Sequence, residues 1–271
     1  MYVVATPIGN LADSSPRSIE VLRAADIVAC EDTRTSRTLL AHHGINARTV
    51  ALHAHNEREA GEKLLKVLRE GGSVALVSDA GTPGVSDPGA LLVAAAHREG
   101  LRVVPLPGPN AAVTAWSASG FLSDRFLFAG FLPAKAGKAL DGLDGPWPVI
   151  LYEAPHRVLA TVSALLERFG PEREIVIARE LSKKFEEIAR LKLAAAPDWL
   201  AAGPHRQQGE FVLVLGPGEE RRGAAGAGEA QRVLRLLLES LPAAEAAKLA
   251  AKITGAPRKE LYAIADRKSV V

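Results

Sequence analysis

A glycine-rich loop over residues 77–89 has the most distinctive chemistry in the sequence. It contains three glycines, two prolines and two aspartates, but no lysine or arginine, in the order VSDAGTPGVSDPG. Glycine allows the backbone to approach a ligand closely. A P-loop would need a lysine and a serine or threonine after its last glycine, and a dinucleotide-binding loop would need a tighter glycine spacing. Because Asp79 and Asp87 would also repel phosphate, the loop is not predicted to hold a nucleotide phosphate.

Bare backbone together with carboxylates suits a ligand that has positive charge and hydrogen-bonding groups. S-adenosylmethionine (SAM), with an ammonium, a sulfonium and ribose hydroxyls, is such a ligand. A Mg²⁺ ion held by Asp79 and Asp87 is a second interpretation, although a metal would not require the intervening glycines and prolines. A tight turn whose aspartates cap local backbone groups is a third. The chemistry of the loop alone leaves these three interpretations open.

Polar side chains also follow two other short apolar runs. Glu31, Asp32 and Arg34 come directly after one predicted strand, and the segment from His53 to Glu57 follows another. Ligands of α/β sheets bind beyond the carboxyl ends of the strands, so these residues are candidates for binding or catalysis. Each has a structural alternative: Arg34 pairs with Asp32 or Glu31, Glu57 caps the helix that follows it, and His53 is satisfied at its strand end.

Neither a metal nor a disulfide is expected. His53 and His55 lie two residues apart, but a His-x-His pair without a third ligand is weak grounds for a metal site. Cys30 is the single cysteine, which excludes an internal disulfide and fits a reducing compartment.

The elements that must position these residues alternate between strand and helix through residue 106. Ser15 followed by Pro16 is a typical helix start. Short apolar strands separated by helices predict βαβ units around a mostly parallel sheet. After an initial strand at Val3-Val4, the expected strands are 26–30, 50–52, 74–77 and 102–106, and the expected helices are 18–25, 35–44, 57–70 and 90–99.

A turn-rich break over residues 105–109 separates this part from a second α/β unit. Polar turns between closely spaced strands predict more antiparallel character there. The segment 216–228, rich in glycine and charge, is predicted to be a linker, and the last two of three short helices after it resemble a helix-turn-helix. We therefore expect domains over 1–109, 110–217 and 229–271. The elements expected after the break are 126–131, 149–152, 158–169, 174–178 and 210–215, then helices over 230–241, 243–254 and 257–266.

Composition and charge narrow the class of protein. The chain has 271 residues, of which 48% are hydrophobic and 24% charged, as in ordinary globular proteins. Its apolar stretches are too short to cross a bilayer and its N-terminus lacks a basic signal region, so we expect a cytoplasmic protein with no membrane contact.

The C-terminal part is basic. From Arg221 onward ten Lys/Arg stand against five Asp/Glu, a balance of +5, which leaves −3 for the rest of the chain. A basic tail indicates a polyanionic partner, and a solvated helical surface is the alternative. Leu249, Ile253, Leu261 and Ile264 are expected to fill the core of this part. The side chains expected to contact phosphate are Lys248, Lys252, Arg258, Lys259, Arg267 and Lys268.

Eight motifs in order give the sequence a family resemblance. They are TPIGN (6–10), CEDTR (30–34), HAHNE (53–57), SDAGTPGVSDPG (78–89), PGPNA (107–111), YEAPHR (152–157), ARELSK (178–183) and GEFV (209–212). On these motifs the chain resembles the tetrapyrrole (precorrin-type) methylase superfamily, and within it the members that methylate the 2′-hydroxyl of a cytidine in 16S ribosomal RNA. The resemblance covers nearly the whole chain, but the segment 193–206 matches the pattern poorly and its role is open.

The resemblance implies a fold, a cofactor and a set of site residues. The fold would be two α/β domains with the SAM cleft between them, plus a small C-terminal helical domain of helix-turn-helix type. SAM would be the methyl donor, 16S rRNA or the small ribosomal subunit the partner, and the protein a homodimer. The residues implied to bind SAM are Pro7, Asp79, Gly81, Thr82, Pro83, Val85, Ser86, Asp87, Asn110, Ala111, Tyr152, Ala178 and Phe211, and those implied to be catalytic are Glu31, Asp32, Arg34 and Asn56.

A 2′-hydroxyl stays protonated at neutral pH, so its methylation requires close alignment and is helped by a proton acceptor. The hypothesis is that Glu31 or Asp32 takes the proton while Arg34 grips RNA phosphate. The sequence does not rank the base among Glu31, Asp32, His53 and Glu57. Two alternatives stay open: a methylase of a tetrapyrrole small molecule, and a non-catalytic RNA-binding protein with a SAM-sensing pocket.

Overall fold

The computed structural model describes residues 1–133, 137–203, 205–218 and 224–266. Two compact units are present, Met1–Leu143 with Trp147–Pro217, and Asp144–Pro146 with Gly218–Val271. Both sheets lie in the first unit and the C-terminal helices lie in the second. The domain boundaries expected from the sequence stay predictions. No helix of the described residues has the length and apolar character needed to cross a membrane.

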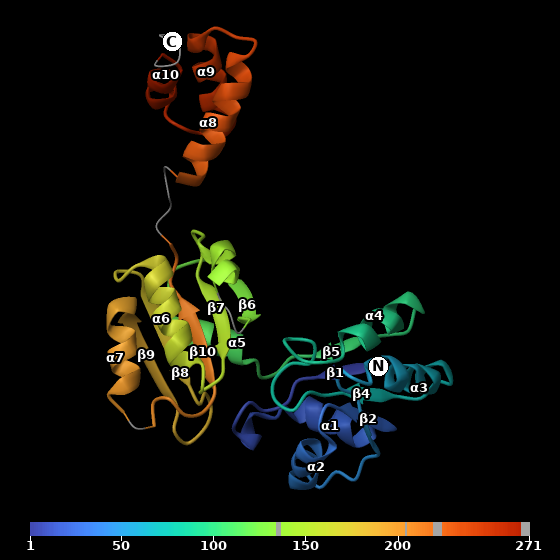
Figure 1. Cartoon of the computed structure of the whole chain (residues 1–271). Coiled ribbons are helices and arrows are strands. Elements are labelled where there is room, and N and C mark those ends of the chain that lie inside the picture. The colour runs from blue at the N-terminus through green and yellow to red at the C-terminus, as the bar shows by residue number, and fades with distance from the viewer. Residues whose placement is uncertain (134–136, 204, 219–223, 267–271) are drawn as a thin grey trace. The chain divides into compact units, whose positions relative to one another are not determined.

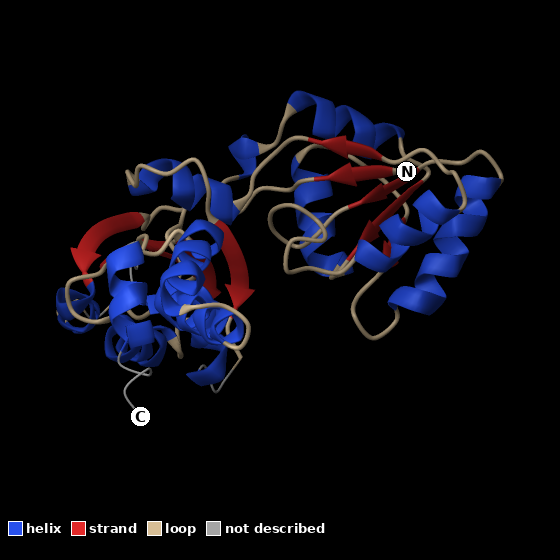
Figure 2. Cartoon of the chain, turned by 90° about the horizontal axis from the view of Figure 1, so that it is seen from above, coloured by secondary structure: helices blue, strands red, loops and turns tan. Residues whose placement is uncertain are grey.

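The first sheet has five parallel strands in the order β3-β2-β4-β1-β5, which confirms the expected parallel sheet. Figures 1 and 2 show helices along both of its faces. Its strands are β1 (Tyr2–Val4), β2 (Ile27–Cys30), β3 (Thr49–Ala51), β4 (Val74–Leu76) and β5 (Val104–Leu106). Its helices are α1 (Pro16–Ala24), α2 (Thr33–His42), α3 (Glu57–Arg69) and α4 (Ala90–Arg98), with a short 3₁₀ turn, η1 (Leu11–Asp13).

Burial on both faces explains why the inner strands β2 and β4 are apolar throughout. Ile27 and Ala29 of β2 belong to the core beneath α3 and α4, whereas Val28 and Cys30 belong to the core beneath α1 and α2. Successive side chains of a strand point to opposite faces, so a strand covered on both sides needs apolar residues at every position.

The second sheet is mostly antiparallel, as the sequence predicts. Its order is β6-β7-β10-β8-β9, and β6 with β7 is its one parallel pair among the described strands. The strands are β6 (Leu127–Phe131), β7 (Val149–Glu153), β8 (Glu174–Arg179), β9 (Glu187–Lys192) and β10 (Phe211–Leu215). The helices are α5 (Ala111–Ser119), α6 (Val158–Phe169) and α7 (Ala196–Ala201), with 3₁₀ turns η2 (Gly137–Leu143) and η3 (Leu193–Ala195).

The segment whose role the sequence leaves open completes the core of this sheet. Leu193, Ala196 and Leu200 of η3 and α7 are fully buried in the same cluster as Val162 and Leu165 of α6. These three side chains lie on one side of a short helical segment, so they cover the end of the sheet beside α6. The described part of 193–206 therefore has a packing role.

The second unit consists of α8 (Ala224–Leu238), α9 (Ala243–Thr254) and α10 (Arg258–Asp266). The expected linker over 216–228 is partly wrong, because α8 begins at Ala224, inside it. Alanine is the best helix former and alternates here with two glycines, so the helix extends towards the N-terminus in spite of their cost. Gly255, with φ +71°, ends α9 in the left-handed conformation that favours glycine.

The expected core of this unit is wrong at three of four positions. Leu261 is buried, but Leu249, Ile253 and Ile264 are 40%, 63% and 37% exposed. Small side chains from α9 occupy the interior instead, because they let the three helices approach closely. The buried residues are Ala230, Leu234, Ala246, Ala247, Ala250, Leu261 and Ala265.

A buried acidic network lies at the end of β7 and accounts for the YEAPHR motif. Glu153 has a fully buried side chain that accepts hydrogen bonds from the Thr161 hydroxyl (2.5 Å) and from the Ala154 backbone N–H (2.8 Å). The Arg157 guanidinium lies 3.2 Å from the Glu153 carboxylate and also donates to the Leu132 carbonyl (2.6 Å). A buried charge requires such partners.

We predict that Arg157→Met lowers the free energy of unfolding by about 3 kcal/mol, because it leaves the Glu153 carboxylate buried without its counter-charge. Urea denaturation measures this loss. Arg168→Met is the matched control, because its ion pair with Asp141 is more exposed and is worth about 1 kcal/mol or less. Equal losses in the two variants would contradict the importance of the buried pair.

Candidate functional site

The loops after β1 and β4 are joined by a two-residue bridge at the carboxyl edge of the first sheet. The Thr6 N–H donates to the Gly81 carbonyl at 2.8 Å, and the Gly81 N–H donates to the Thr6 carbonyl at 3.0 Å. Gly81 holds φ at +85°, which L side chains rarely adopt, so glycine is required here. The Thr6 hydroxyl also donates to the Ser78 carbonyl at 3.0 Å.

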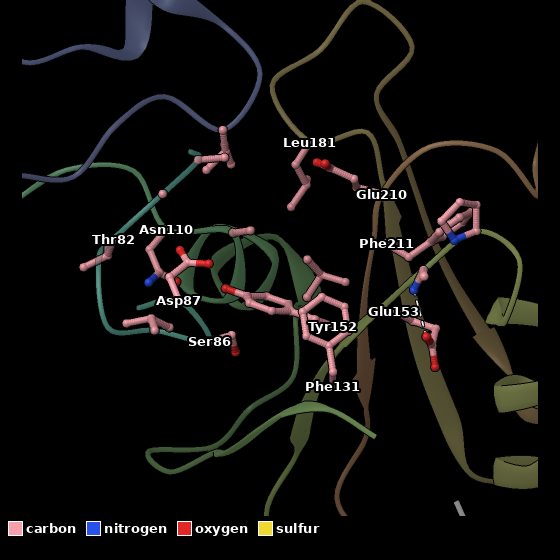
Figure 3. A pocket seen from close by; sticks show the side chains of 18 residues that line it. Thr82, Ser86, Asp87, Asn110, Phe131, Tyr152, Glu153, Leu181, Glu210 and Phe211 are labelled. Atoms are coloured by element: carbon pink, nitrogen blue, oxygen red, sulfur yellow. Dashed lines mark hydrogen bonds between the residues drawn. The ribbon is translucent and has the colours of Figure 1, made fainter. Parts of the chain in front are cut away.

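A cavity of about 310 Å³ lies beside this bridge in the first unit. Figure 3 shows Thr82, Ser86, Asp87 and Asn110 on one side of it and aromatic side chains, including Tyr152 and Phe131, on the other. Loops that follow strands of the first sheet therefore meet strands of the second sheet at one cavity. Its lining consists of Ile8, Ala80, Gly81, Thr82, Val85, Ser86, Asp87, Asn110, Ala111, Phe131, Tyr152, Glu153, Ala154, Pro155, Leu181, Glu210, Phe211 and Val212.

Nine of the thirteen residues expected to bind SAM line this cavity, namely Gly81, Thr82, Val85, Ser86, Asp87, Asn110, Ala111, Tyr152 and Phe211. Pro7 and Asp79 line a second cavity instead. Ala178 is fully buried in the core beneath α5, and Pro83 lines neither cavity. Their roles in binding stay predictions.

Sequence reasoning missed nine lining residues. Most are next to a residue it did select or lie within a quoted motif, since a loop that approaches a cavity presents several neighbours to it. Phe131, in β6, has no such signal. The nine are Ile8, Ala80, Phe131, Glu153, Ala154, Pro155, Leu181, Glu210 and Val212.

The lining is acidic and aromatic. It includes Asp87 and Glu210 but no lysine, arginine or histidine among the described residues. Burial raises the pKa of Asp87, and a hydrogen bond with Ser78 opposes that rise. The rings of Phe131 and Tyr152 pack edge to face, with centroids 5.5 Å apart. A cation near Asp87 would offset the cost of its burial, and the rings suit a flat apolar group.

Two polar lining residues, Asn110 and Tyr152, accept hydrogen bonds from backbone N–H groups, and a third, Ser86, has a strained backbone. Asn110 caps α5, because its side-chain oxygen accepts from the Val113 N–H at 3.2 Å. Ser86 holds a left-handed φ of +65°, which costs a non-glycine residue on the order of 1 kcal/mol. The Tyr152 hydroxyl accepts from the Ala112 N–H at 3.2 Å.

Asp32 and Arg34 form the structural pair that the sequence left as an alternative to a catalytic role. The Asp32 carboxylate caps α2 and lies 2.6 Å from the Arg34 guanidinium. The Arg34 side chain, by its hydrogen bond, lowers the pKa of Asp32 to about 2. Such a carboxylate is a poor proton acceptor near neutral pH. The Arg34 side chain remains 87% exposed and can reach outward.

Glu31 differs from its neighbour. Its half-buried side chain forms no hydrogen bond with any residue that the structure describes. Burial raises the pKa of Glu31, and the negative charges of Asp87 and Asp79 add to the rise. Glu31 is thus within electrostatic range of a residue of each cavity.

The HAHNE segment is held by its own side chains. The Asn56 side-chain oxygen accepts from the His53 N–H (2.8 Å), and its amide donates to the Ala51 carbonyl (3.1 Å), which makes Asn56 a residue that fixes the turn. Glu57 begins α3, but its carboxylate caps α4, accepting from the N–H groups of Gly89 and Leu91, each at 2.9 Å. The expected capping of its own helix is therefore wrong.

The two histidines of this segment have rings 6.0 Å apart. The His53 Nδ1 atom is buried without a hydrogen-bond partner among the described residues. No group of three or more potential ligands within the described residues is arranged to hold a metal ion. The prediction of a metal-free site stays a prediction.

Known proteins share both parts of this architecture. A family described as tetrapyrrole (corrin/porphyrin) methylases matches residues 1–197, and the RsmI C-terminal HTH domain matches residues 224–266. Two proteins named ribosomal RNA small subunit methyltransferase I are similar over most of their length. The one from Mesorhizobium japonicum is 50% identical, over 97% of this chain and 90% of its own, and the one from Pseudomonas aeruginosa is 51% identical, over 97% and 95%.

A solved structure shares the fold of the first unit at low sequence identity. It is the uroporphyrin-III C-methyl transferase of Thermus thermophilus, complexed with S-adenyl homocysteine. Its TM-score is 0.55 at 19% identity, over 80% of this chain and 96% of that one. At this identity the likeness is one of fold alone.

We predict that Glu57→Ala lowers the free energy of unfolding by about 1 kcal/mol, because two N–H groups at the start of α4 lose their acceptor. Amide hydrogen exchange should accelerate at Gly89 and Leu91. Glu59→Ala, which removes an exposed i,i+4 pair with Lys63 on the same helix, is the control. Unchanged exchange at both amides in Glu57→Ala would contradict the capping role.

Proposed function

This chain belongs to the tetrapyrrole (corrin/porphyrin) methylase family, and from that premise we propose that it methylates the 2′-hydroxyl of a cytidine in 16S rRNA of the small ribosomal subunit. It is a SAM-dependent methyltransferase. The proposal rests on sequence identity: about half of the residues are identical to those of proteins named ribosomal RNA small subunit methyltransferase I. Homodimer formation and a cytoplasmic location belong to the same proposal.

The first cavity suits SAM. Asp87, half-buried and without a basic residue in the described lining, would face the positive charge of the ligand, and the glycine at position 81 lets the backbone approach the ligand closely. Phe131, Tyr152 and Phe211 would pack on the flat adenine. When bound, SAM supplies an electrophilic methyl group on a sulfonium centre.

Glu31 is the proposed proton acceptor. The leaving proton of a 2′-hydroxyl needs a base with a free lone pair and a pKa closer to neutral than that of an ordinary carboxyl. Glu31 has no competing hydrogen bond among the described residues, and its pKa is raised by burial. Asp32 is held at low pKa by Arg34. These contrasts support Glu31 over Asp32, and leave Asp32 and Asn56 as positioning residues.

We predict that Glu31→Gln lowers kcat for methyl transfer about 100-fold while the Kd for SAM stays unchanged. In the wild type, kcat should be high above the pKa of Glu31 and fall as pH decreases through it, at a higher pH than an ordinary glutamate would give. The Glu31→Gln variant should lose that limb of the pH profile. Asp32→Asn is the comparison: an equal loss of kcat there, with the limb retained in Glu31→Gln, would reject Glu31 as the base.

A basic face on the second unit is proposed to bind RNA. Lys248 and Lys252 lie one turn apart on α9, and Arg258 and Lys259 begin α10; all four are exposed. None of them forms an ion pair with a described residue. The exposed Ile253 lies beside this charge. Arg267 and Lys268, expected to join the face, fall outside the described residues.

We predict that the double variant Lys248→Ala/Lys252→Ala weakens RNA binding. It should also make the slope of log K against log salt concentration shallower by roughly 1–2, because binding through fewer phosphate contacts releases fewer counterions. The Kd for SAM should not change. Lys63→Ala/Lys66→Ala on α3 is the charge-matched control. An identical salt slope in both double variants would reject this face as an RNA contact.

One experiment separates the proposed substrate from a tetrapyrrole. Methyl transfer from labelled SAM is measured side by side to undermodified small subunits, naked 16S rRNA and a tetrapyrrole. The proposal expects label at a cytidine 2′-oxygen in one of the two RNA substrates. Label in the tetrapyrrole alone would reject it.

A further inference from the structure

A second cavity of about 310 Å³ lies at the same edge of the first sheet. Ser78 and Asp79 line this second cavity, and the residues that follow them, 80–82, line the first. In the same way, Pro7 lines the second cavity and its neighbour Ile8 lines the first. The two cavities therefore share a wall. The second is lined by Thr6, Pro7, Leu11, Thr35, Ser36, Thr38, Leu39, Ser78 and Asp79.

The lining excludes an anion. It has no lysine, arginine or histidine among the described residues, and its one charged side chain is Asp79. Pro7, Leu11 and Leu39 give it apolar surface, and α2 contributes the hydroxyls of Thr35 and Thr38. A neutral, flat group with a hydrogen-bond donor at one edge matches this combination.

Asp79 is oriented as an acceptor. Its Oδ1 atom accepts from the Asp32 backbone N–H at 3.0 Å, which fixes the carboxylate. The other oxygen, Oδ2, accepts no hydrogen bond from a described residue. Outside the lining, the exposed Arg34 lies one turn from Thr38 on α2, where it can reach a phosphate.

We propose that this second cavity holds the base of the reacting nucleotide, and that Asp79 selects cytosine by accepting from its N4 amino group. The proposal rests on the proposed function. Carboxylates are suited to the N4 donor of cytosine, whereas uracil presents a carbonyl oxygen there, which Asp79 would repel. Enzymes that do chemistry on a base take that base out of the stack into a pocket, and the proposal extends this arrangement to a nucleotide that reacts at its ribose. The attached ribose then lies beside the wall that the two cavities share.

The first test exchanges the base and the acceptor together. Substrates are small subunits whose reacting nucleotide is either cytidine or uridine. Asp79→Asn keeps an oxygen for the Asp32 N–H and adds an amide donor for uracil. Wild type should prefer cytidine in kcat/KM by about tenfold or more, and Asp79→Asn should lose most of that preference. An unchanged preference in Asp79→Asn would overturn the proposal.

The second test fills the cavity. Thr38→Trp should raise the KM for RNA about tenfold or more by occluding the base. Ala41→Trp, on the same helix but outside the lining, is the matched control and should leave KM unchanged. Equal KM values in wild type and Thr38→Trp would also overturn the proposal. Methyl transfer by wild type to the subunit would still stand, so the proposed function is judged separately.

A binding measurement makes the cavity testable without turnover. Saturation-transfer NMR on the full chain, with S-adenosylhomocysteine present, compares cytidine with uridine. Cytidine should give a signal in wild type and in Ala41→Trp but not in Thr38→Trp. If wild type transfers no methyl to any RNA, the proposed function fails, and the proposal for the cavity, which rests on it, fails with it. Equal signals from cytidine and uridine in wild type would reject selection by Asp79.

Discussion

The bridge between Thr6 and Gly81 fixes the two loops that line both cavities. Its two backbone hydrogen bonds join the ends of β1 and β4, which are neighbours in the first sheet. Because all five strands of that sheet are parallel, their carboxyl ends and the loops after them collect at one edge. The bridge joins two of these loops, and its two residues line different cavities: Gly81 lines the first and Thr6 the second. Gly81 makes this possible, since its left-handed φ would strain any other residue.

Most polar side chains at this edge accept hydrogen bonds from backbone N–H groups, and only a few are left free to take part in chemistry. Asp32 caps α2, Glu57 caps α4 through one carboxylate oxygen, and Asn56 closes a turn, so each already accepts hydrogen bonds from N–H groups. Glu31 and one oxygen of Asp79 have no such partner among the described residues. The negative charges of Asp79 and Asp87 both act on Glu31. Carboxylates that repel one another favour a cationic ligand, and the pKa of Glu31 is raised by burial and by these charges; both suit methyl transfer from a sulfonium.

Residue size decides which side chains of the second unit are buried and which are exposed. Its core is built largely from alanines, which bring α8, α9 and α10 together. The larger side chains Leu249 and Ile253 are consequently left outside, next to Lys248 and Lys252. A surface that combines aliphatic groups with lysines that form no ion pair among the described residues suits a nucleic acid, because phosphate contacts give affinity while apolar groups contact exposed bases or riboses.

The sequence by itself determined the parallel first sheet, the mixed second sheet, the helix start at Ser15 and the motifs that gather at the site. These depend on local patterns, because apolar periodicity and capping residues act within a few positions. Only the tertiary structure decided that Asp79 lines the second cavity and not the first, that Glu57 caps α4, and that Asp32 pairs with Arg34 while Glu31 does not. It also placed Leu193 and Leu200 in a core and Leu249 at the surface. Such outcomes depend on which residues distant in the chain share a face or a hydrogen bond, and no local pattern specifies those partners.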